Sequence, residues 1–336
     1  MPDLLVPAVV FAVSLAVLLA ASDVFVSAVE RLGLSLGVSP FIVGATVVAG
    51  GTSLPELVSS VLAVRAGESA IVVGNVVGSN VANILLVIGV AAVVGGHLRV
   101  DRELMRVDLP LLTASAAFLL VAALSGSFSW YDGVVALAAL VVYTDFTLSE
   151  EARLDEVVEE LVEEHADVDV DVSAVGTDAL EAAAGETTVG PRTVAATLLA
   201  LALVFVAADR LVAAILSLAT GLGVGTELVA ITAVAVGTSL PEAAVSVVAV
   251  RRGDVDVAVG NVLGSNVFNT FAVMGVSSFV APVAVPASVL SYALPAMVVA
   301  TLLYYFVVQD REITRWEGAT LLLLYVTFLA NLTRFA

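Results

Sequence analysis

Two glutamates, Glu56 and Glu242, stand in matching oxygen-rich motifs inside strongly apolar stretches. Each motif reads Gly-Thr-Ser-Leu-Pro-Glu and is followed by Gly-Asn-x-x-Gly-Ser-Asn-x-x-Asn; the first copy begins at Gly51 and the second at Gly237. Polar and ionisable groups are costly within a bilayer, so their presence there indicates function. Carboxylates, hydroxyls, amides and backbone carbonyls are all oxygen ligands, which suit a hard cation such as Ca2+. The motifs therefore predict a cation site, and its two carboxylates could cancel the charge of one Ca2+ or hold Na+ ions.

The two motif copies are part of a repeat that extends beyond them. They align without a gap at an offset of 186 residues (237 minus 51), and self-similarity at a fixed offset marks a repeated structural unit. Pro55 and Pro241 lie beside glycines, and a proline lacks an N–H and clashes with the preceding turn, so both helices should break there. A break frees backbone carbonyls, which are tolerated at membrane depth only where protein or a water-filled cavity surrounds them.

The composition indicates a membrane protein. Of 336 residues, 60% are hydrophobic and 13% are charged, and runs of about 20 apolar residues are typical of membrane helices. The net charge of -19, with no lysine, suggests acidic loops adapted to high salt, and the lack of a basic patch argues against a nucleic-acid partner. Without cysteine there are neither disulfides nor thiolate metal sites. A serine nucleophile needs a base such as histidine, and no motif serine has a histidine within the same predicted membrane span. This argues against an enzyme.

The expected fold class is an all-α polytopic membrane protein with ten transmembrane helices in two inverted five-helix repeats, helices 2 and 7 being broken. Five is an odd number, so equivalent motifs enter the membrane from opposite sides, as in many secondary transporters. The expected domains are a first repeat over 1–148, an acidic cytoplasmic linker over 149–191 with a short helix at 153–165, and a second repeat over 192–336. The ten spans are expected at about 4–29, 40–64, 69–95, 105–124, 130–148, 192–219, 226–250, 255–280, 287–308 and 316–334.

Arginine placement sets the expected orientation. Loops on one side of the ten spans carry ten arginines and loops on the other side carry two. Positive charge concentrates on the cytoplasmic side, so both termini should lie outside the cell membrane. The repeat interface is complete within one chain, so a monomer is sufficient.

At these motifs the chain resembles the Na+/Ca2+ exchanger family of the cation/Ca2+ antiporter superfamily, of the prokaryotic type, across both halves. The resemblance implies alternating-access exchange of Ca2+ for Na+ through one central Ca2+ site flanked by Na+ sites, with the first and sixth helices sliding over a static core. No cofactor is implied. The ion ligands that it implies are the backbone carbonyls of Ala49 and Ala235 and the side chains of Thr52, Ser53, Glu56, Ser79, Asn83, Thr238, Ser239, Glu242, Ser265 and Asn269.

Other interpretations remain open from the sequence. The first alternative is an H+/Ca2+ exchanger, although that branch typically has Asn-Ala-Thr before the glutamate; protons could also compete at Glu56 and Glu242. K+-dependent relatives carry Asp where this chain has Asn269, which argues against K+ dependence. More distant alternatives are a channel or an ion-binding scaffold. Within the motifs, packing or bridging of helices is expected for Gly74, Gly78, Gly260, Gly264, Asn75, Asn80, Asn261 and Asn266.

Overall fold

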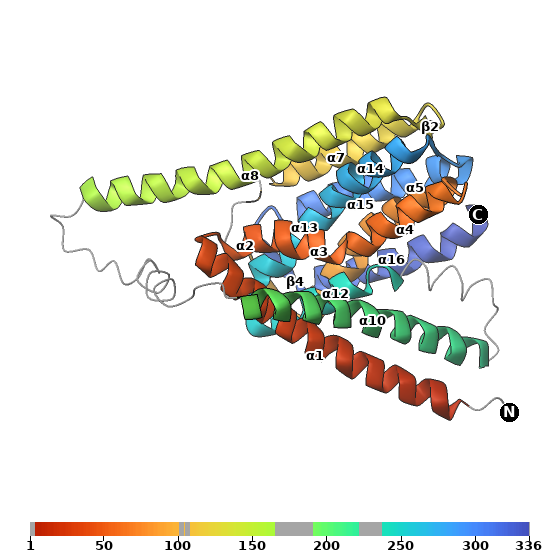
Figure 1. The fold of residues 1–336 in the computed structure, drawn as a ribbon, viewed down its shortest axis with the longest axis horizontal. Coiled ribbons are helices and arrows are strands. Elements are labelled where there is room, and N and C mark those ends of the chain that lie inside the picture. The colour runs from red at the N-terminus through yellow and green to blue at the C-terminus, as the bar shows by residue number, and fades with distance from the viewer. Residues whose placement is uncertain (1–3, 101–103, 105–107, 165–190, 222–236, 336) are drawn as a thin grey trace.

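The computed structural model describes residues 4–100, 104, 108–164, 191–221 and 237–335. In these ranges the chain forms an elongated bundle of helices, with one long helix projecting from it (Figure 1). Seven of the described helical segments are long and apolar enough to cross a membrane. They are Leu5–Gly33, Pro40–Arg65, Ala70–Gly95, Trp130–Ser149, Thr193–Leu218, Val255–Val280 and Val289–Val307.

The described residues of the N-terminal half form mainly helices and two short strands. Its second and third predicted spans are each divided into consecutive helical segments, some of them π-helical and labelled η. The elements are α1 (Leu5–Leu36), α2 (Pro40–Val43), η1 (Gly44–Val48), α3 (Ala49–Thr52), α4 (Leu54–Arg65), α5 (Ala70–Ala82), η2 (Asn83–Val87), α6 (Ile88–Gly95), β1 (His97–Arg99), α7 (Asp108–Ala123), β2 (Ser127–Phe128) and α8 (Trp130–Glu164).

The C-terminal half repeats much of this order. The predicted seventh span is described only from residue 237 onwards. The elements are α10 (Pro191–Gly221), α12 (Leu240–Arg252), α13 (Val255–Phe268), η4 (Asn269–Val273), α14 (Met274–Val280), β3 (Val283–Ala284), η5 (Val289–Ala293), α15 (Leu294–Val307), β4 (Glu312–Thr314) and α16 (Arg315–Phe335).

Helix α8 is longer than the sequence analysis predicted. It does not end near residue 148 but continues to Glu164, so the separate helix expected over 153–165 is instead its last part. Residues 149–164 are rich in Glu, which favours the helix, and contain neither Gly nor Pro to stop it. At 1.5 Å per residue, its 35 residues span about 50 Å, and its end projects well beyond the bundle (Figure 1).

Two short antiparallel strand pairs join the halves, and the sequence analysis predicted neither. In one pair Leu98 of β1 lies opposite Ile313 of β4, and in the other Ser127 of β2 lies opposite Ala284 of β3. Adding 186 to 98 gives 284, and subtracting 186 from 313 gives 127, so the pairs are equivalent under the offset of the repeat. They lie towards opposite ends of the bundle (Figure 1).

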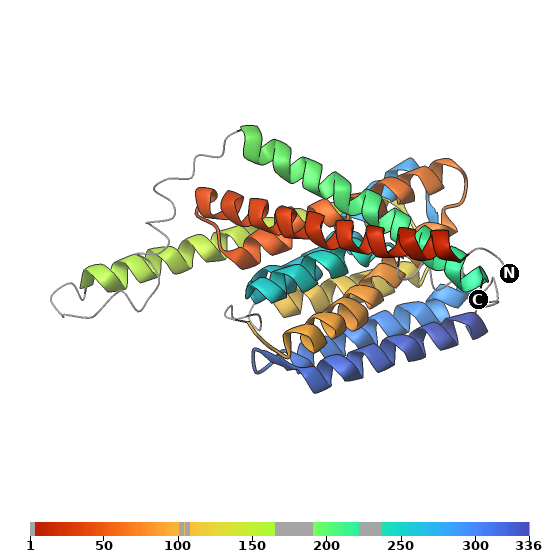
Figure 2. The same ribbon diagram turned by 90° about the horizontal axis from the view of Figure 1, so that it is seen from below.

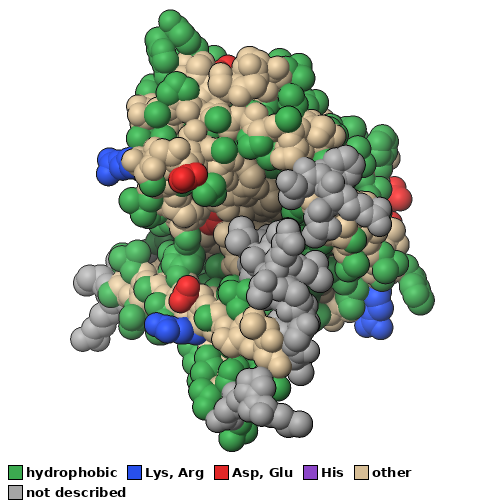
Figure 3. Space-filling view, turned by 90° about the vertical axis from the view of Figure 1, so that its right-hand side faces the viewer, with side chains coloured by type: hydrophobic (Ala, Val, Ile, Leu, Met, Phe, Trp, Pro, Cys, Tyr) green, Lys and Arg blue, Asp and Glu red, His purple; other side chains and the backbone are tan. Residues whose placement is uncertain are grey.

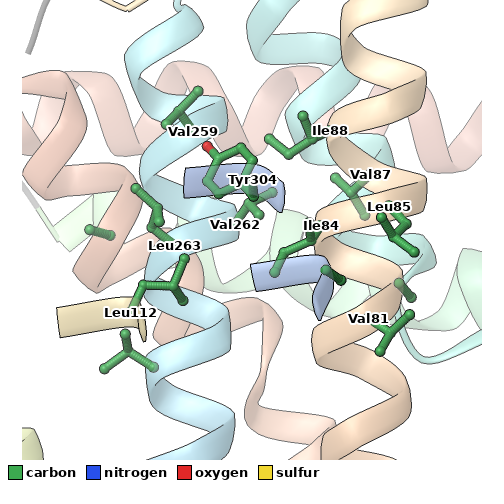
Figure 4. Packing of buried hydrophobic residues seen from close by; sticks show 14 of the residues in the cluster. Val81, Ile84, Leu85, Val87, Ile88, Leu112, Val259, Val262, Leu263 and Tyr304 are labelled. Carbon is green, nitrogen blue, oxygen red and sulfur yellow. The ribbon is translucent and has the colours of Figure 1, made fainter. Parts of the chain in front are cut away.

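Helix α13 lies at the centre of the core. Every residue from Val257 to Val267 is buried, and α13 packs against α5, η2 and α6 with Tyr304 of α15 between them (Figure 4). On its other side, a Cβ atom at Gly260 or Gly264 would overlap the backbone of α2 or η1. The prediction that these two glycines allow close helix packing is therefore confirmed.

The equivalent glycines of the first motif are Gly74 and Gly78, and the described residues do not test their packing. No described atom lies within 4 Å of a Cβ built at either position. Their expected neighbours, residues 227 and 231, fall in the range 222–236, outside the described residues. The packing role of these two glycines stays a prediction.

Helices α1 and α10 lie side by side on one face of the bundle (Figures 1 and 2). They share a small hydrophobic cluster with α12 that is separate from the main core. An ion pair adds to this contact, because the Arg252 Nε atom at the end of α12 lies 2.8 Å from the Asp23 carboxylate of α1. The residues of the small cluster are Leu18, Ala21, Val204, Ala207, Ala208, Leu211 and Ala244.

Candidate cation site

Both motif glutamates lie in the first turn of a helix that follows a break. Helix α3 ends at Thr52, Ser53 has φ -88° and ψ 3°, and α4 then begins with Pro55 in its first turn. In the second copy Ser239 has φ -95° and ψ 6° immediately before α12. Proline is tolerated at the start of a helix, where its missing N–H is not needed. The breaks predicted at the two prolines are therefore present in both copies.

The helix after each break motif contains an equivalent π-helical turn. Segment η2 begins at Asn83 and η4 begins at Asn269, and these residues differ by the repeat offset of 186. Single π-helical turns inside α-helices occur frequently at functional sites. The sequence analysis missed them, because no residue type marks a π-helical turn; only their coincidence with the repeated asparagines draws attention to them.

The structure buries the predicted ligands deep inside the bundle. Thr238 is half-buried, and Ala235 lies outside the described residues. Glu56 and Glu242 are each 1% exposed, which is unusual for carboxylates that form no ion pair with a described residue. The other buried members of the predicted set are Ala49, Thr52, Ser53, Ser79, Asn83, Ser239, Ser265 and Asn269.

Many oxygen atoms of the predicted ligands have no hydrogen-bond partner among the described residues. Buried polar atoms are normally paired, because an unpaired one loses its solvation without compensation. Seven of the exceptions belong to predicted ligands, and six of these form three pairs related by the repeat offset, at positions 53 and 239, 56 and 242, and 83 and 269. They are Ser53 Oγ, Glu56 Oε2, Asn83 Oδ1, Ser239 Oγ, Glu242 Oε2, Ser265 Oγ and Asn269 Oδ1.

The two motif copies face each other across the bundle. The Ser79 and Thr238 hydroxyls, from different copies, lie 3.2 Å apart. The Thr52 hydroxyl donates to Asn261 Oδ1 at 3.3 Å, and Asn261 Nδ2 donates to the backbone carbonyl of Glu242 at 3.4 Å. The Glu56 and Glu242 carboxylates lie close enough to repel each other. The structure therefore brings together the two carboxylates that the sequence placed 186 residues apart.

The motif asparagines bridge helices, as predicted. Asn261 Nδ2 donates to Ser246 Oγ at 3.0 Å and links α13 to α12, and Asn75 makes the equivalent bond to Ser60 at 3.5 Å. The other two, Asn80 and Asn266, connect α5 and α13 across the two halves; their hydrogen bonds are taken up below. Helix bridging therefore explains why these four amides are buried, without requiring any of them to bind a cation.

The donor set suits a hard cation. The described residues contain no group of three or more His, Cys, Asp and Glu side chains, so the site consists of two carboxylates surrounded by hydroxyl and amide oxygens. Ca2+ accepts six to eight such ligands in a flexible geometry. Transition metals prefer sites with imidazole or thiolate ligands, which this set lacks.

Helices α1 and α10 pass directly over the two breaks. A Cβ atom at Gly51 would lie 3.3 Å from Leu201 of α10 and 3.8 Å from Phe25 of α1. At the second break, a Cβ atom at Gly237 would lie 3.0 Å from Val212 of α10. The end of the bundle where β2 lies is hollowed near its centre (Figure 3). The helix pair thus packs against the chain at both breaks.

Comparison with known proteins identifies relatives along the whole chain. A family model described as "Sodium/calcium exchanger protein" matches residues 6–148 and 192–334. The sodium/calcium exchanger MaX1 of Methanosarcina acetivorans is 31% identical over 335 residues, covering 93% of this chain and 94% of that protein. The putative antiporter CaxA of Alkalimonas amylolytica is 30% identical over 331 residues, covering 97% of this chain and 98% of that protein.

Solved structures agree with this assignment. The sodium-calcium exchanger NCX_Mj, soaked with 2.5 mM Na+ and 0.1 mM Ca2+, superposes with a TM-score of 0.76. The two sequences are 28% identical, and the match covers 97% of this chain and 98% of that chain. NCX_Mj soaked with zero Na+ and Ca2+ gives a TM-score of 0.77 over 99% of this chain.

Proposed function

This chain belongs to the sodium/calcium exchanger protein family, and on that premise we propose that it exchanges Ca2+ for Na+ across the membrane by alternating access. The physiological direction that we propose is Ca2+ extrusion driven by the Na+ gradient. The single observation that carries the proposal is the gathering of buried, unpartnered oxygens around Glu56 and Glu242. Two carboxylates neutralise one Ca2+, and Na+ ions that need the same carboxylates could not bind together with it.

The proposed ligand set follows the two motifs. It comprises the side chains that lie buried around the two glutamates, together with a backbone carbonyl freed before each break. We assign the Ca2+ position to the space between the two carboxylates and the Na+ positions to its flanks. The full set is Ala49, Thr52, Ser53, Glu56, Ser79, Asn83, Ala235, Thr238, Ser239, Glu242, Ser265 and Asn269.

The proposed architecture has ten membrane helices in two inverted repeats. Three kinds of feature recur at the offset of 186 residues and support it: the helix breaks, the π-helical turns and the strand pairs. The strand pairs lie towards opposite ends of the bundle, as inverted halves require (Figure 1). In this arrangement, α1 and α10 move over the two breaks while the remaining helices stay packed; the small cluster supports this role, because part of the packing of α1 and α10 lies outside the main core.

The proposed setting is the cell membrane, with a monomer as the working unit. Both termini would lie outside and the acidic segment 149–191 inside, because the arginine-rich loops favour the cytoplasm. Protons would compete with the transported ions at the two glutamates, since protonation removes the charge that holds a cation.

Transport by the purified protein in lipid vesicles tests the proposal. Vesicles loaded with Na+ and diluted into Na+-free buffer should take up Ca2+, and Glu56→Gln or Glu242→Gln should abolish the uptake. Glu68→Gln is the matched control, because it removes the same charge from an exposed loop outside the site. Uptake that follows a pH gradient and ignores Na+ would favour the H+/Ca2+ exchanger. Ca2+ flux without any counter-ion would favour a channel.

A further inference from the structure

Behind the predicted ligands, asparagines from opposite halves form two reciprocal hydrogen bonds. Asn269 Nδ2 donates to Asn80 Oδ1 at 3.2 Å, and Asn83 Nδ2 donates to Asn266 Oδ1 at 3.2 Å. The pairs are related by the repeat offset, since 80 plus 186 is 266 and 83 plus 186 is 269. All four side chains are at most 3% exposed. Each ligand asparagine therefore has its amide nitrogen held by an asparagine of the other half.

The orientation of the Asn80 amide is fixed by chemistry. Its Nδ2 donates to the backbone carbonyl of Asn266 at 3.3 Å and to the Thr270 hydroxyl at 3.1 Å. A backbone carbonyl only accepts hydrogen bonds, so an Asn80 amide turned by 180° would place two oxygens against each other. Asn80 Oδ1 must then face Asn269, and it can accept only from the nitrogen of that amide. The oxygen of Asn269 is left pointing away from this bond, and it has no partner among the described residues.

We propose that Asn80 and Asn266 are positioning residues that determine which end of the Asn269 and Asn83 amides faces the cation. An amide can present either an oxygen, which binds a cation, or an N–H group, which repels it. The second-layer asparagines remove that choice by occupying the N–H groups. This inference rests on the proposed function, because it assumes that Asn83 and Asn269 are cation ligands.

The two halves do not hold their amides equally firmly. Thr270, which accepts from Asn80, corresponds to Ile84 in the first half (270 minus 186), and isoleucine has no hydroxyl. Asn266 Nδ2 is buried and has no hydrogen-bond partner among the described residues. The chain of bonds that orients Asn269 is therefore anchored at its far end, whereas the one that orients Asn83 is not. Thr270 makes the second-repeat ligand the more rigid of the two.

A double-mutant cycle tests the positioning role. Asn80→Ala should weaken Ca2+ binding roughly tenfold, because the Asn269 amide is then free to turn its N–H groups towards the cation. In an Asn269→Asp background the same change should cost less than about twofold, or improve binding, because the two oxygens of a carboxylate are equivalent and need no orientation. Ca2+ binding is measured by titration calorimetry at slightly alkaline pH, alongside Na+-dependent Ca2+ uptake in vesicles.

A merely structural role would give a different result. If Asn80 only supported packing, Asn80→Ala would weaken binding by the same factor in both backgrounds, and that outcome would overturn the proposal. Should Asn80→Ala fail to fold, Thr270→Val provides the nearly isosteric test: it should weaken Ca2+ binding by about two- to threefold, whereas Ile84→Val, its matched control, should not. Equal effects of these two changes would also overturn it. Because calorimetry measures binding alone, a wild-type protein that binds Ca2+ without exchanging Na+ would refute the proposed function and leave this test intact.

Discussion

Replacing Gly264 with alanine should destabilise the protein, because the added methyl group has no room. Gly264 lies within α13 and faces η1, where a Cβ atom would overlap the carbonyl oxygen, carbonyl carbon and Cα of Ala45. These are backbone atoms within a helical segment, so rotating a side chain cannot relieve the overlap. The whole of α13 must move away from η1.

The size of the effect follows from two opposing contributions. Overpacking a closely packed core costs about 1–3 kcal/mol, and the upper end applies where the neighbour is backbone. Alanine favours the helical state over glycine by roughly 1 kcal/mol, which offsets part of this cost. The net loss of about 2 kcal/mol is a decrease of about 30-fold in the folding equilibrium constant. Because Ser265 is the next residue, moving α13 should also weaken Ca2+ transport.

Denaturant titration of the purified protein in mild detergent, followed by tryptophan fluorescence, measures the loss. Gly264→Val should cost more than Gly264→Ala, because a larger side chain requires a larger shift. Gly50→Ala is the control: no described atom lies within 4 Å of a Cβ at that position, and the equivalent residue of the second repeat, at 236, is a valine, so alanine should leave stability unchanged or slightly raised. If Gly264→Ala unfolded at the wild-type midpoint and transported Ca2+ at the wild-type rate, the reasoning from close backbone contact would be refuted.

Two further predictions concern helix contacts. If the halves repeat as proposed, Gly78 corresponds to Gly264, so Gly78→Ala should lower the free energy of unfolding by a similar amount of about 2 kcal/mol in the same titration; wild-type stability would contradict the repeat at this contact. Arg252→Gln removes ion pairs of 2.8 Å to Asp23 and 3.4 Å to Glu30, whose side chains are 55% and 28% exposed, so the loss should stay below about 1 kcal/mol and disappear in molar salt. A loss that persists in molar salt would contradict an electrostatic origin.

The repeat made much of the helix order and the site predictable from the sequence. A motif found twice at one offset places its polar residues at equivalent positions, and proline dictates the breaks through its missing N–H. That is why the sequence alone was enough to predict that Glu56 and Glu242 meet. The glycines at 260 and 264 were predictable for a related reason, since only small residues allow two helix backbones to come so close.

Other features depend on contacts that a single sequence does not reveal. The strand pairs have only two or three residues on each strand and depend on partners from the other half, so no local pattern marks them. The end of α8 was misplaced because the boundary was set by hydropathy, whereas the glutamate-rich sequence that follows the apolar segment is charged but still favours a helix. The hydrogen bond between Thr270 and Asn80 was equally unpredictable. Its role becomes apparent only when Thr270 is compared with the equivalent Ile84, which has no hydroxyl.

The pairing of β1 with β4 has a consequence for how the protein is made. Leu98 is synthesised 215 residues (313 minus 98) before its partner Ile313. At 5–20 residues per second, β1 therefore waits roughly 10–40 s on the ribosome for the strand that completes it. Each strand has its partner in the other half, so β1 and β4 can pair only when almost the entire polypeptide has emerged. Closure of this pair would be a late step in biogenesis, and a chain truncated before β4 would leave β1 open to wrong partners.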